Sequence, residues 1–302
     1  MNEPVSAAAM TTRKDTPMTT TTLSPALQRR ALLLKAGAAA GAATVAGTLA
    51  LVAARPAHAQ VANLNDAINK AGRQRMLSQR MGKAWLALAH KVQEPAARQV
   101  LEQSVALFER QLAELKSYAP NAGIRDTYGQ LDAAWATHKA TLLGGTPALA
   151  GATAMLQADA KVLALAHQGT VQYESASGKP VGHLVNLAGR QRMLSQRMAK
   201  FYLAAQLPVD AAVAAAEIAK ARTEFVAATE VLRKAPEAND RIRQELLLAD
   251  GQWVFFDAAL QRMQAGGVAG STARQVSEVF VASENLLSSM DRVTGLYAAL
   301  AG

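Results

Sequence analysis

Two arginines in a repeated eleven-residue segment are the side chains of this sequence best suited to binding chemistry. The segment AGRQRMLSQRM occurs at residues 71–81 and again at residues 188–198, with no substitution between the copies. Arg75 and Arg192 occupy the same place in the two copies. A guanidinium group donates hydrogen bonds in a planar fork, which suits small planar oxyanions. The repeat therefore suggests anion binding rather than bond-making chemistry.

Small residues accompany each arginine on one face of a predicted helix. Neither Gly nor Pro interrupts residues 73–81 or 190–198, and Arg, Gln, Met and Leu are good helix formers. A glycine inside a helix costs about 1 kcal/mol relative to alanine, so we expect the motif glycines to admit a second backbone. An asparagine precedes each glycine at the same spacing. The predicted site consists of Asn69, Gly72, Arg75, Asn186, Gly189 and Arg192.

The charges around both motifs have one sign. Residues 67–93 and 175–209 contain no carboxylate, although both stretches are rich in Lys and Arg. Helices commonly offset charges with partners three or four residues away, and these helices do not. Two explanations remain open: either each motif arginine forms a buried salt bridge with an acid on another helix, or the arginines bind an external anion.

The motif resembles a known family signature. The sequence from Asn69 to Met81, N-x-A-G-R-Q-R-M-L-S-Q-R-M, is similar to the signature of the type IV pilus chemotaxis-transducer N-terminal domain, the PilJ type. It also resembles the periplasmic sensor domain of nitrate/nitrite-responsive histidine kinases. The resemblance implies a four-helix bundle in which the arginine before the methionine binds nitrate or nitrite, where two first helices meet. Carried over to this sequence, that arginine is Arg75 in one copy and Arg192 in the other.

The offset between the copies predicts two whole domains. Residue 188 follows residue 71 by 117 positions, which is far longer than a solenoid unit. Residues 61–302 read as eight helices with short links, and no segment shows sustained period-two alternation. We therefore predict an all-α fold of two antiparallel four-helix bundles in tandem, at residues 60–178 and 179–302.

Residues 1–59 have the pattern of an export signal. Arg29 and Arg30 precede an apolar run at residues 36–54, and small residues then lead to Gln60. This order resembles a twin-arginine signal and predicts cleavage before Gln60, with a periplasmic mature chain. An uncleaved membrane anchor is the alternative.

The sequence offers little support for catalysis. The chain has no cysteine, and residues 60–302 contain four histidines, none at the spacing of a helical metal site. We expect these histidines to be surface or core residues: His90, His138, His167 and His183. Ser78 and Ser195 have no obvious base, so we expect them to bond backbone or glutamine groups. Asp132 and Asp250 are expected to be structural. We predict no enzyme, no metal and no cofactor.

The net charge argues against a nucleic-acid partner. The formal net charge of the whole chain is +9, and residues 1–59 contain six basic and two acidic residues, which leaves +5 for the rest. Much of the excess then belongs to the two motifs rather than to a broad basic face.

Two functions from different classes fit these residues. One is a periplasmic nitrate or nitrite sensor that signals through an unidentified membrane sensor or transport component, because no membrane span, kinase or methyl-accepting region is recognisable after the repeats. The other is a non-catalytic helical adaptor or structural protein with no small-molecule ligand.

The pairing of the motif helices is open at this stage. The two helices could face each other within one chain and hold one anion. Alternatively, the short link at residues 178–180 could keep Arg75 and Arg192 apart, so that each site would need a second chain in a homodimer.

Overall fold

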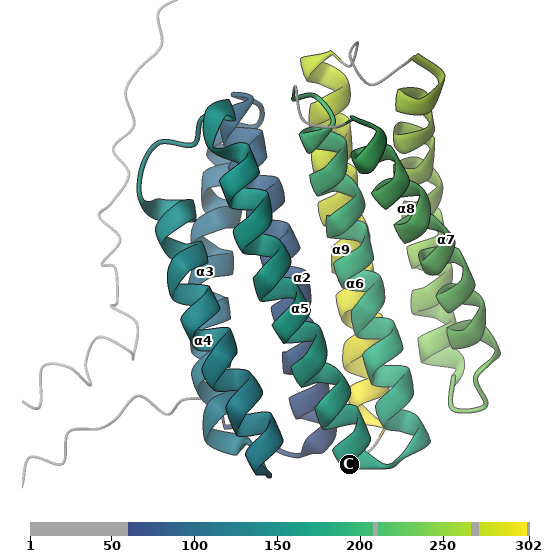
Figure 1. Ribbon diagram of the computed structural model, residues 1–302. Helices are drawn as coiled ribbons and strands as arrows, with labels where there is room; N and C mark the ends of the chain where they lie inside the picture. The colour runs from purple at the N-terminus through teal and green to yellow at the C-terminus, as the bar shows by residue number, and fades with distance from the viewer. Residues whose placement is uncertain (1–59, 208–210, 267–271, 301–302) are drawn as a thin grey trace, which may run out of the picture. The chain divides into compact units, whose positions relative to one another are not determined.

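The fold is all-α, as the sequence predicts. The structure is a computed structural model that describes residues 60–207, 211–266 and 272–300, and these residues form eight α-helices, one short 3-10 helix and no strand (Figure 1). The predicted export signal at residues 1–59 lies outside the described residues.

The two repeats supply four α-helices each. The first contains α2 (Leu64–Ala89), α3 (Glu94–Tyr118), α4 (Ala122–Leu143), the 3-10 helix η1 (Leu149–Gly151) and α5 (Ala152–Ser177). The second contains α6 (Pro180–Ala204), α7 (Ala211–Lys234), α8 (Asp240–Gly266) and α9 (Ala273–Ala299). The motifs lie on α2 and α6, the first helix of each repeat.

Local sequence signals set the starts of the motif helices. Asn63 caps α2, because its side-chain oxygen accepts a hydrogen bond from the Asp66 backbone N–H at 2.9 Å. Pro180 occupies the first turn of α6, where its missing N–H costs nothing. Gly178 ends α5 with a positive φ of 59°, a conformation that glycine adopts without strain. The chain thus turns sharply from α5 into α6, and the two helices are not joined end to end.

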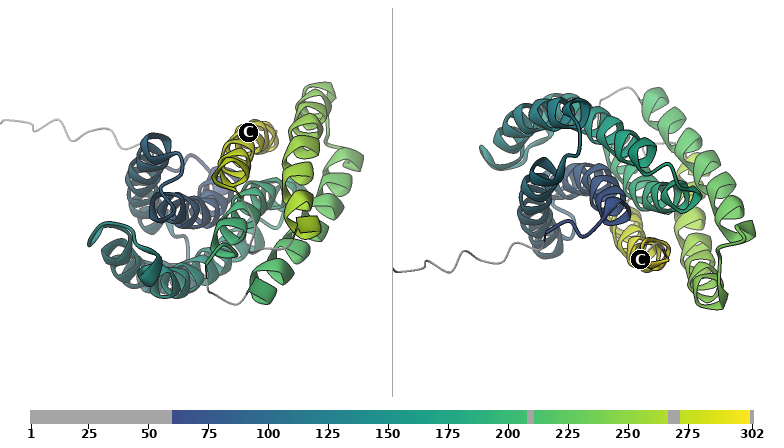
Figure 2. Two further views of the ribbon diagram at one scale, coloured as in Figure 1. Left: turned by 90° about the horizontal axis from the view of Figure 1, so that it is seen from above. Right: turned by 90° about the horizontal axis from the view of Figure 1, so that it is seen from below.

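In each repeat, the first helix packs against the second and the fourth, and the third packs against the fourth. The most extensive contact in the described structure joins the repeats, because α2 packs along α6. Viewed along the helix axes, α2, α5, α6 and α9 form the centre, with α3 and α4 on one side and α7 and α8 on the other (Figure 2). The motif helices therefore meet within one chain, which decides between the two pairings left open above.

Helix α5 and the preceding η1 turn together are long and apolar enough to cross a membrane by length and composition. However, α5 packs against α2 and α4 and carries Asp159, whose side chain is fully buried. Helix α5 therefore packs in the bundle through one buried face, and its other residues are exposed or half-buried.

Buried contacts show which positions of the repeats correspond. The hydroxyl of Tyr173 on α5 donates to the Leu115 carbonyl at 2.8 Å, and the hydroxyl of Tyr297 on α9 donates to the Leu232 carbonyl at 2.7 Å. Each tyrosine follows, by three positions, a threonine that bonds the preceding turn of its own helix. Position 167 of α5 therefore corresponds to position 291 of α9, and position 160 corresponds to position 284.

Candidate functional site

The predicted glycines bring α2 and α6 into backbone contact. A Cβ atom added to Gly72 would lie 3.8 Å from the Cα of Gly189, and one added to Gly189 would lie 3.9 Å from the Cα of Gly72. This is ordinary van der Waals distance, so the absent side chains allow the two helices to touch here. The predicted role of both glycines agrees with this geometry.

The two motif arginines lie side by side at this crossing. The same Gly72 Cβ position is 3.2 Å from Nη2 of Arg75 and 3.7 Å from Nη2 of Arg192. Seen from Gly189 the distances are 3.7 and 3.3 Å to the same two nitrogens. Both arginines are fully buried. Two cations thus share one interior space, where their charges are poorly screened.

Each arginine reaches the asparagine of the opposite helix, as an approximate two-fold relation requires. Nη2 of Arg75 donates to the Asn186 side-chain oxygen at 2.7 Å and to its carbonyl at 3.3 Å. Nη2 of Arg192 donates to the Asn69 carbonyl at 3.1 Å. All six predicted site residues are therefore gathered at one place.

The two halves differ in what each arginine meets on its other side. Nη1 of Arg192 forms an ion pair with Asp291 on α9, and Arg73 shares the same carboxylate at 2.8 Å. Nη1 of Arg75 instead donates to Nδ1 of His167 on α5, at 3.3 Å. Positions 167 and 291 correspond, so a neutral ring stands in one half where a carboxylate stands in the other. One of the two buried arginines is neutralised and the other is not.

Burial and neighbouring positive charges lower the pKa values of both motif arginines. Burial, together with the nearby cations Arg190 and Arg192, lowers the pKa of Arg75 to about 9. Burial and Arg73 lower the pKa of Arg192 to about 10, against the opposing effect of Asp291. Both groups are still charged at pH 7, and their lowered pKa values mean that these charges destabilise the folded state there. A bound anion would relieve part of this cost.

Several buried polar atoms at the crossing have no hydrogen-bond partner among the described residues. They are Nε of Arg75, Nε of Arg192 and the side-chain oxygen of Asn69. Buried polar groups are nearly always paired, so unpaired ones need an explanation. Two of these atoms are donors on cations, which is the arrangement that an incoming anion would satisfy.

The other motif cations have carboxylate partners on other helices, which sequence analysis did not identify. On α2, Arg73 pairs with Asp291, and both Arg80 and Lys83 pair with Glu284. On α6, Arg190, Arg197 and Lys200 pair with Glu224, Glu217 and Asp159 respectively. The helices thus find their counter-charges across the bundle. Among these motif cations, Arg75 alone has no ion pair within the part of the chain that the structure describes.

The motif serines and glutamines have structural roles. The hydroxyl of Ser78 donates to the Arg75 carbonyl at 3.0 Å and accepts from Gln79 at 3.0 Å. The hydroxyl of Ser195 donates to the Arg192 carbonyl at 2.8 Å. This confirms the predicted bonding of both serines. Asp132 pairs with Lys116, and Asp250 pairs with Arg233.

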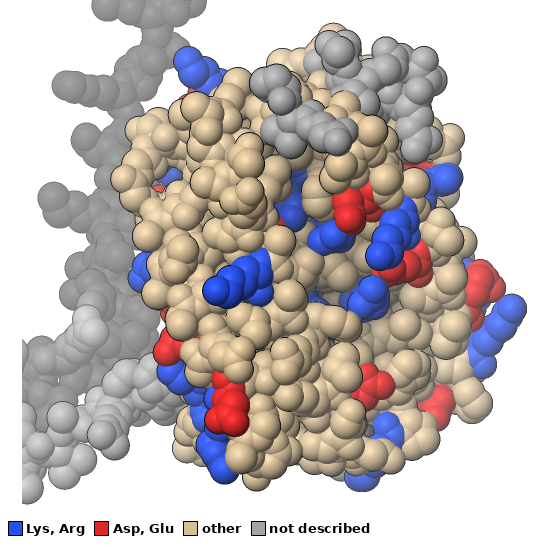
Figure 3. Space-filling view, viewed as in Figure 1, with Lys and Arg blue, Asp and Glu red and all other residues tan. Residues whose placement is uncertain are grey.

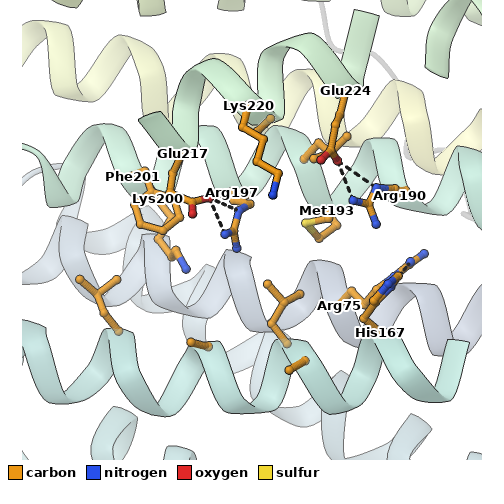
Figure 4. Close-up of a pocket in the computed structure, with 16 residues that line it drawn as sticks. Arg75, His167, Arg190, Met193, Arg197, Lys200, Phe201, Glu217, Lys220 and Glu224 are labelled. Atoms are coloured by element: carbon orange, nitrogen blue, oxygen red, sulfur yellow. Dashed lines mark hydrogen bonds and ion pairs between the residues drawn. The ribbon is translucent and has the colours of Figure 1, made fainter. Parts of the chain in front are cut away.

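A groove opens beside Arg75, between α5, α6 and α7. Its volume is about 400 Å³, and Arg75 and His167 lie together at one end of it (Figure 4). Arg190 and Arg197 line the groove with their partners Glu224 and Glu217, and Lys220 reaches in from α7 (Figure 4). On the surface, basic side chains gather over this part of the molecule with acidic ones among them (Figure 3).

The family of the chain can be stated from a comparison with known families. The model of the type IV pili methyl-accepting chemotaxis transducer N-terminal domain matches residues 57–167 and again residues 173–279. The two matches together cover more than half of the chain and include both motifs. The chain belongs to this family. No curated protein and no solved structure matches it.

Membership makes the chain a sensory domain of the chemotaxis-transducer type, present in two tandem copies. Domains of this type signal to partner components, and they are typically extracytoplasmic. The repeated motif of both copies lies at the α2–α6 crossing, so the two copies of the motif contact each other within one chain.

The residues that distinguish the two repeats could not be recognised from the sequence pattern. His167 was expected to be an ordinary surface or core residue, but its ring contacts Arg75. Asp291 and Glu284 were not singled out, because they lie about 200 positions from the α2 cations that they neutralise. The correspondence of Tyr173 with Tyr297 is the one signal in the sequence that could have aligned α5 with α9 and revealed His167 opposite Asp291.

Proposed function

We propose that this chain is an extracytoplasmic sensor of a small oxyanion, nitrate or nitrite, held between α2 and α6 by Arg75 and Arg192. The single observation that carries the proposal is the pair of fully buried guanidinium groups in one shared space. Among the described residues, one carboxylate, Asp291, forms an ion pair with them. The resemblance of the motif to nitrate/nitrite sensor domains supports the choice of anion. The proposed role is binding and not catalysis.

Electrostatic magnitudes favour an occupied site. An anion about 4 Å from a guanidinium group gains about 4 kcal/mol at an effective dielectric constant of about 20. Repulsion between the two arginines opposes the empty state, and their burial, which is the main cause of both lowered pKa values, adds to its cost. Hydrogen bonds to charged groups add about 1.5–3 kcal/mol each. The unpaired Nε atoms supply donors for them.

The alternative of an adaptor with no ligand is supported by the other motif cations. These cations form ion pairs with carboxylates on neighbouring helices. Such pairs hold the helices together and require no external anion. Arg75 separates the two proposals. Helix packing alone does not explain a fully buried arginine whose side-chain partners are an asparagine oxygen and a neutral imidazole ring, because a buried charge without a counter-charge is destabilising.

We further propose how the site reports its state. An anion held between α2 and α6 favours one relative placement of the two repeats and so shifts a population of conformations. A partner protein, a membrane sensor or a transport component, would read that shift. The proposed location is the periplasm. Residues 1–59 serve as a twin-arginine-like export signal in this proposal and are then cleaved. Dimerisation of the chain remains a separate expectation.

Replacement of Arg75 tests the proposed ligand. We expect the mature chain, residues 60–302, to give saturable heat with nitrate, and Arg75→Met to weaken that binding at least tenfold. The unliganded variant should unfold at the same temperature or a higher one, because it loses a buried charge that has no carboxylate partner. Calorimetric titration and thermal unfolding measure the two effects.

Arg110→Met is the matched control, because Arg110 lies on α3 with a side chain that is 55% exposed. It should bind nitrate like the parent. Equal nitrate affinity in the parent and in Arg75→Met would place the site elsewhere. Absence of saturable heat in the parent would favour the adaptor.

A further inference from the structure

The groove beside Arg75 has one apolar wall and one wall that combines charged and apolar side chains. Helix α5 contributes Leu156, Ala160, Leu163 and Ala164 on one side. Helices α6 and α7 contribute most of the charged side chains on the other side, together with the apolar residues Met193, Leu194, Phe201 and Ala221. The volume of about 400 Å³ lies within the range of small-molecule sites. A ligand that fills this groove must therefore present both an apolar body and a negative charge.

The charge in the groove is positive. Its lining includes five Lys or Arg side chains and two Glu side chains: Arg75, Arg190, Arg197, Lys200, Lys220, Glu217 and Glu224. Glu217 and Glu224 pair with Arg197 and Arg190, and Lys200 pairs with Asp159 behind the wall. Arg75, which is buried, and Lys220, which is exposed, have no ion pair among the described residues. Arg75 and Lys220 are therefore the two cations of the groove that can pair with a negatively charged ligand.

The other half of the molecule shows what fills the corresponding space. There, α9 places Glu284 on Arg80 and Lys83, and places Asp291 on Arg73 and Arg192. At the corresponding positions α5 has Ala160 and His167. Helix α5 thus presents a small apolar residue and a neutral ring where α9 presents two carboxylates. Helix α5 supplies one carboxylate to the cations of the groove, Asp159 on Lys200, but it supplies none to Arg75.

His167 is neutral at the mouth of this space. Burial and the cations Arg75 and Arg190 lower its pKa below the usual value for histidine, against the opposing effects of Glu174 and Glu224. Its Nδ1 accepts from Arg75, and the residue itself is exposed. An exposed ring can rotate away, so a carboxylate can replace it on Nη1 of Arg75.

We propose that this groove binds an organic carboxylate with an apolar body. The carboxylate lies at Arg75, where Asp291 lies for Arg192, and the body extends along Leu163, Ala160 and Leu156. Seven residues of α5 separate His167 from Ala160, which is about 10 Å along the helix. That distance accommodates a medium-length chain. This inference rests on the proposed function in one respect, because Arg75 binds the nitrate in that proposal and the organic carboxylate in this one.

Titration of the mature chain with acetate, hexanoate and octanoate tests the apolar wall. The expected order of affinity is octanoate, hexanoate, acetate, with a gain of up to about fourfold for each buried CH₂ group. Octanoate should also compete with nitrate, because both need Arg75. Equal affinity for acetate and octanoate would overturn the proposal.

Ala160→Glu copies the α9 residue Glu284 into the groove. Ala160 is exposed, so the variant should fold, and its carboxylate can reach Arg197 and Lys200 as Glu284 reaches Arg80 and Lys83. We expect it to lose at least tenfold in octanoate affinity while nitrate affinity is unchanged. Ala154→Glu is the matched control, an exposed position of α5 that does not line the groove, and it should bind octanoate like the parent. Unchanged octanoate affinity in Ala160→Glu would contradict the assignment of the groove.

The two proposals fail in different ways. If nitrate binds but octanoate binds no better than acetate, the groove proposal is wrong and the nitrate sensor stands. If octanoate binds and Ala160→Glu abolishes it while nitrate gives no heat, the groove proposal stands and the nitrate ligand is wrong. If neither binds, both are wrong.

Discussion

His167→Asp should weaken nitrate binding at least tenfold and raise the melting temperature. The change gives Arg75 the carboxylate that Arg192 already has in Asp291, because positions 167 and 291 correspond. An internal anion neutralises the buried cation and competes with any ligand for it. We expect at least a tenfold loss of affinity, or about 1.4 kcal/mol, measured by calorimetric titration alongside thermal unfolding.

Two companion variants sharpen this test. His167→Asn has a similar size without the charge, so it should keep nitrate affinity within a few-fold of the parent. Asp291→Asn frees Arg192 from its carboxylate, so it should bind nitrate at least as tightly as the parent and should melt at a lower temperature. If His167→Asp binds nitrate like the parent, Arg75 is not the residue that holds the anion.

Asp159→Asn should be among the most destabilising substitutions in the chain. Asp159 and Lys200 form an ion pair with side chains that are 0% and 2% exposed, and Asp159 also accepts from Gln79 at 2.9 Å. Removal of one partner leaves a buried charge uncompensated, which typically costs about 3–5 kcal/mol. Lys200 and Gln79 hold the pKa of Asp159 below its ordinary value although burial alone would raise it. Equilibrium unfolding in urea measures the loss.

The matched control is Asp132→Asn. Asp132 pairs with Lys116, but both side chains are more than 40% exposed, so the change should cost less than about 1 kcal/mol. The double variant Asp159→Asn with Lys200→Met should recover part of the loss, since it removes the orphaned cation as well. Similar costs at positions 159 and 132 would contradict the assigned importance of the buried pair.

Much of the fold could be predicted from the sequence because its signals are local. The identical motifs, the helix-breaking residues between them and the absence of strand alternation predict eight helices in two repeats, and the structure has them. Asn63 and Pro180 mark helix starts through contacts within a few residues. The division into domains at residue 178 remains a prediction, because α2 and α6 pack so extensively that residues Ala54–Gly302 form one compact unit.

The members of the site could be predicted, but not the difference between its halves. Gly72 and Arg75 share a helix face, so their association follows from helical geometry. The partners of Arg75 and Arg192 come from α5 and α9, and such contacts between distant helices leave no local trace in the sequence. The carboxylate partners of the motif cations could not be predicted for the same reason, because they lie on other helices. What distinguishes Arg75 from the remaining cations became visible only in three dimensions.

The most direct test of the account is the stoichiometry of nitrate binding to residues 60–302, measured by calorimetry with light scattering on the same samples. The account predicts one nitrate per chain, with no change in mass on binding, because α2 and α6 of a single chain build the site. One nitrate for every two chains, or saturable binding by a monomeric fragment of residues 61–177, would contradict it, since a site built by Arg75 and Arg192 together needs both motif helices and only one chain.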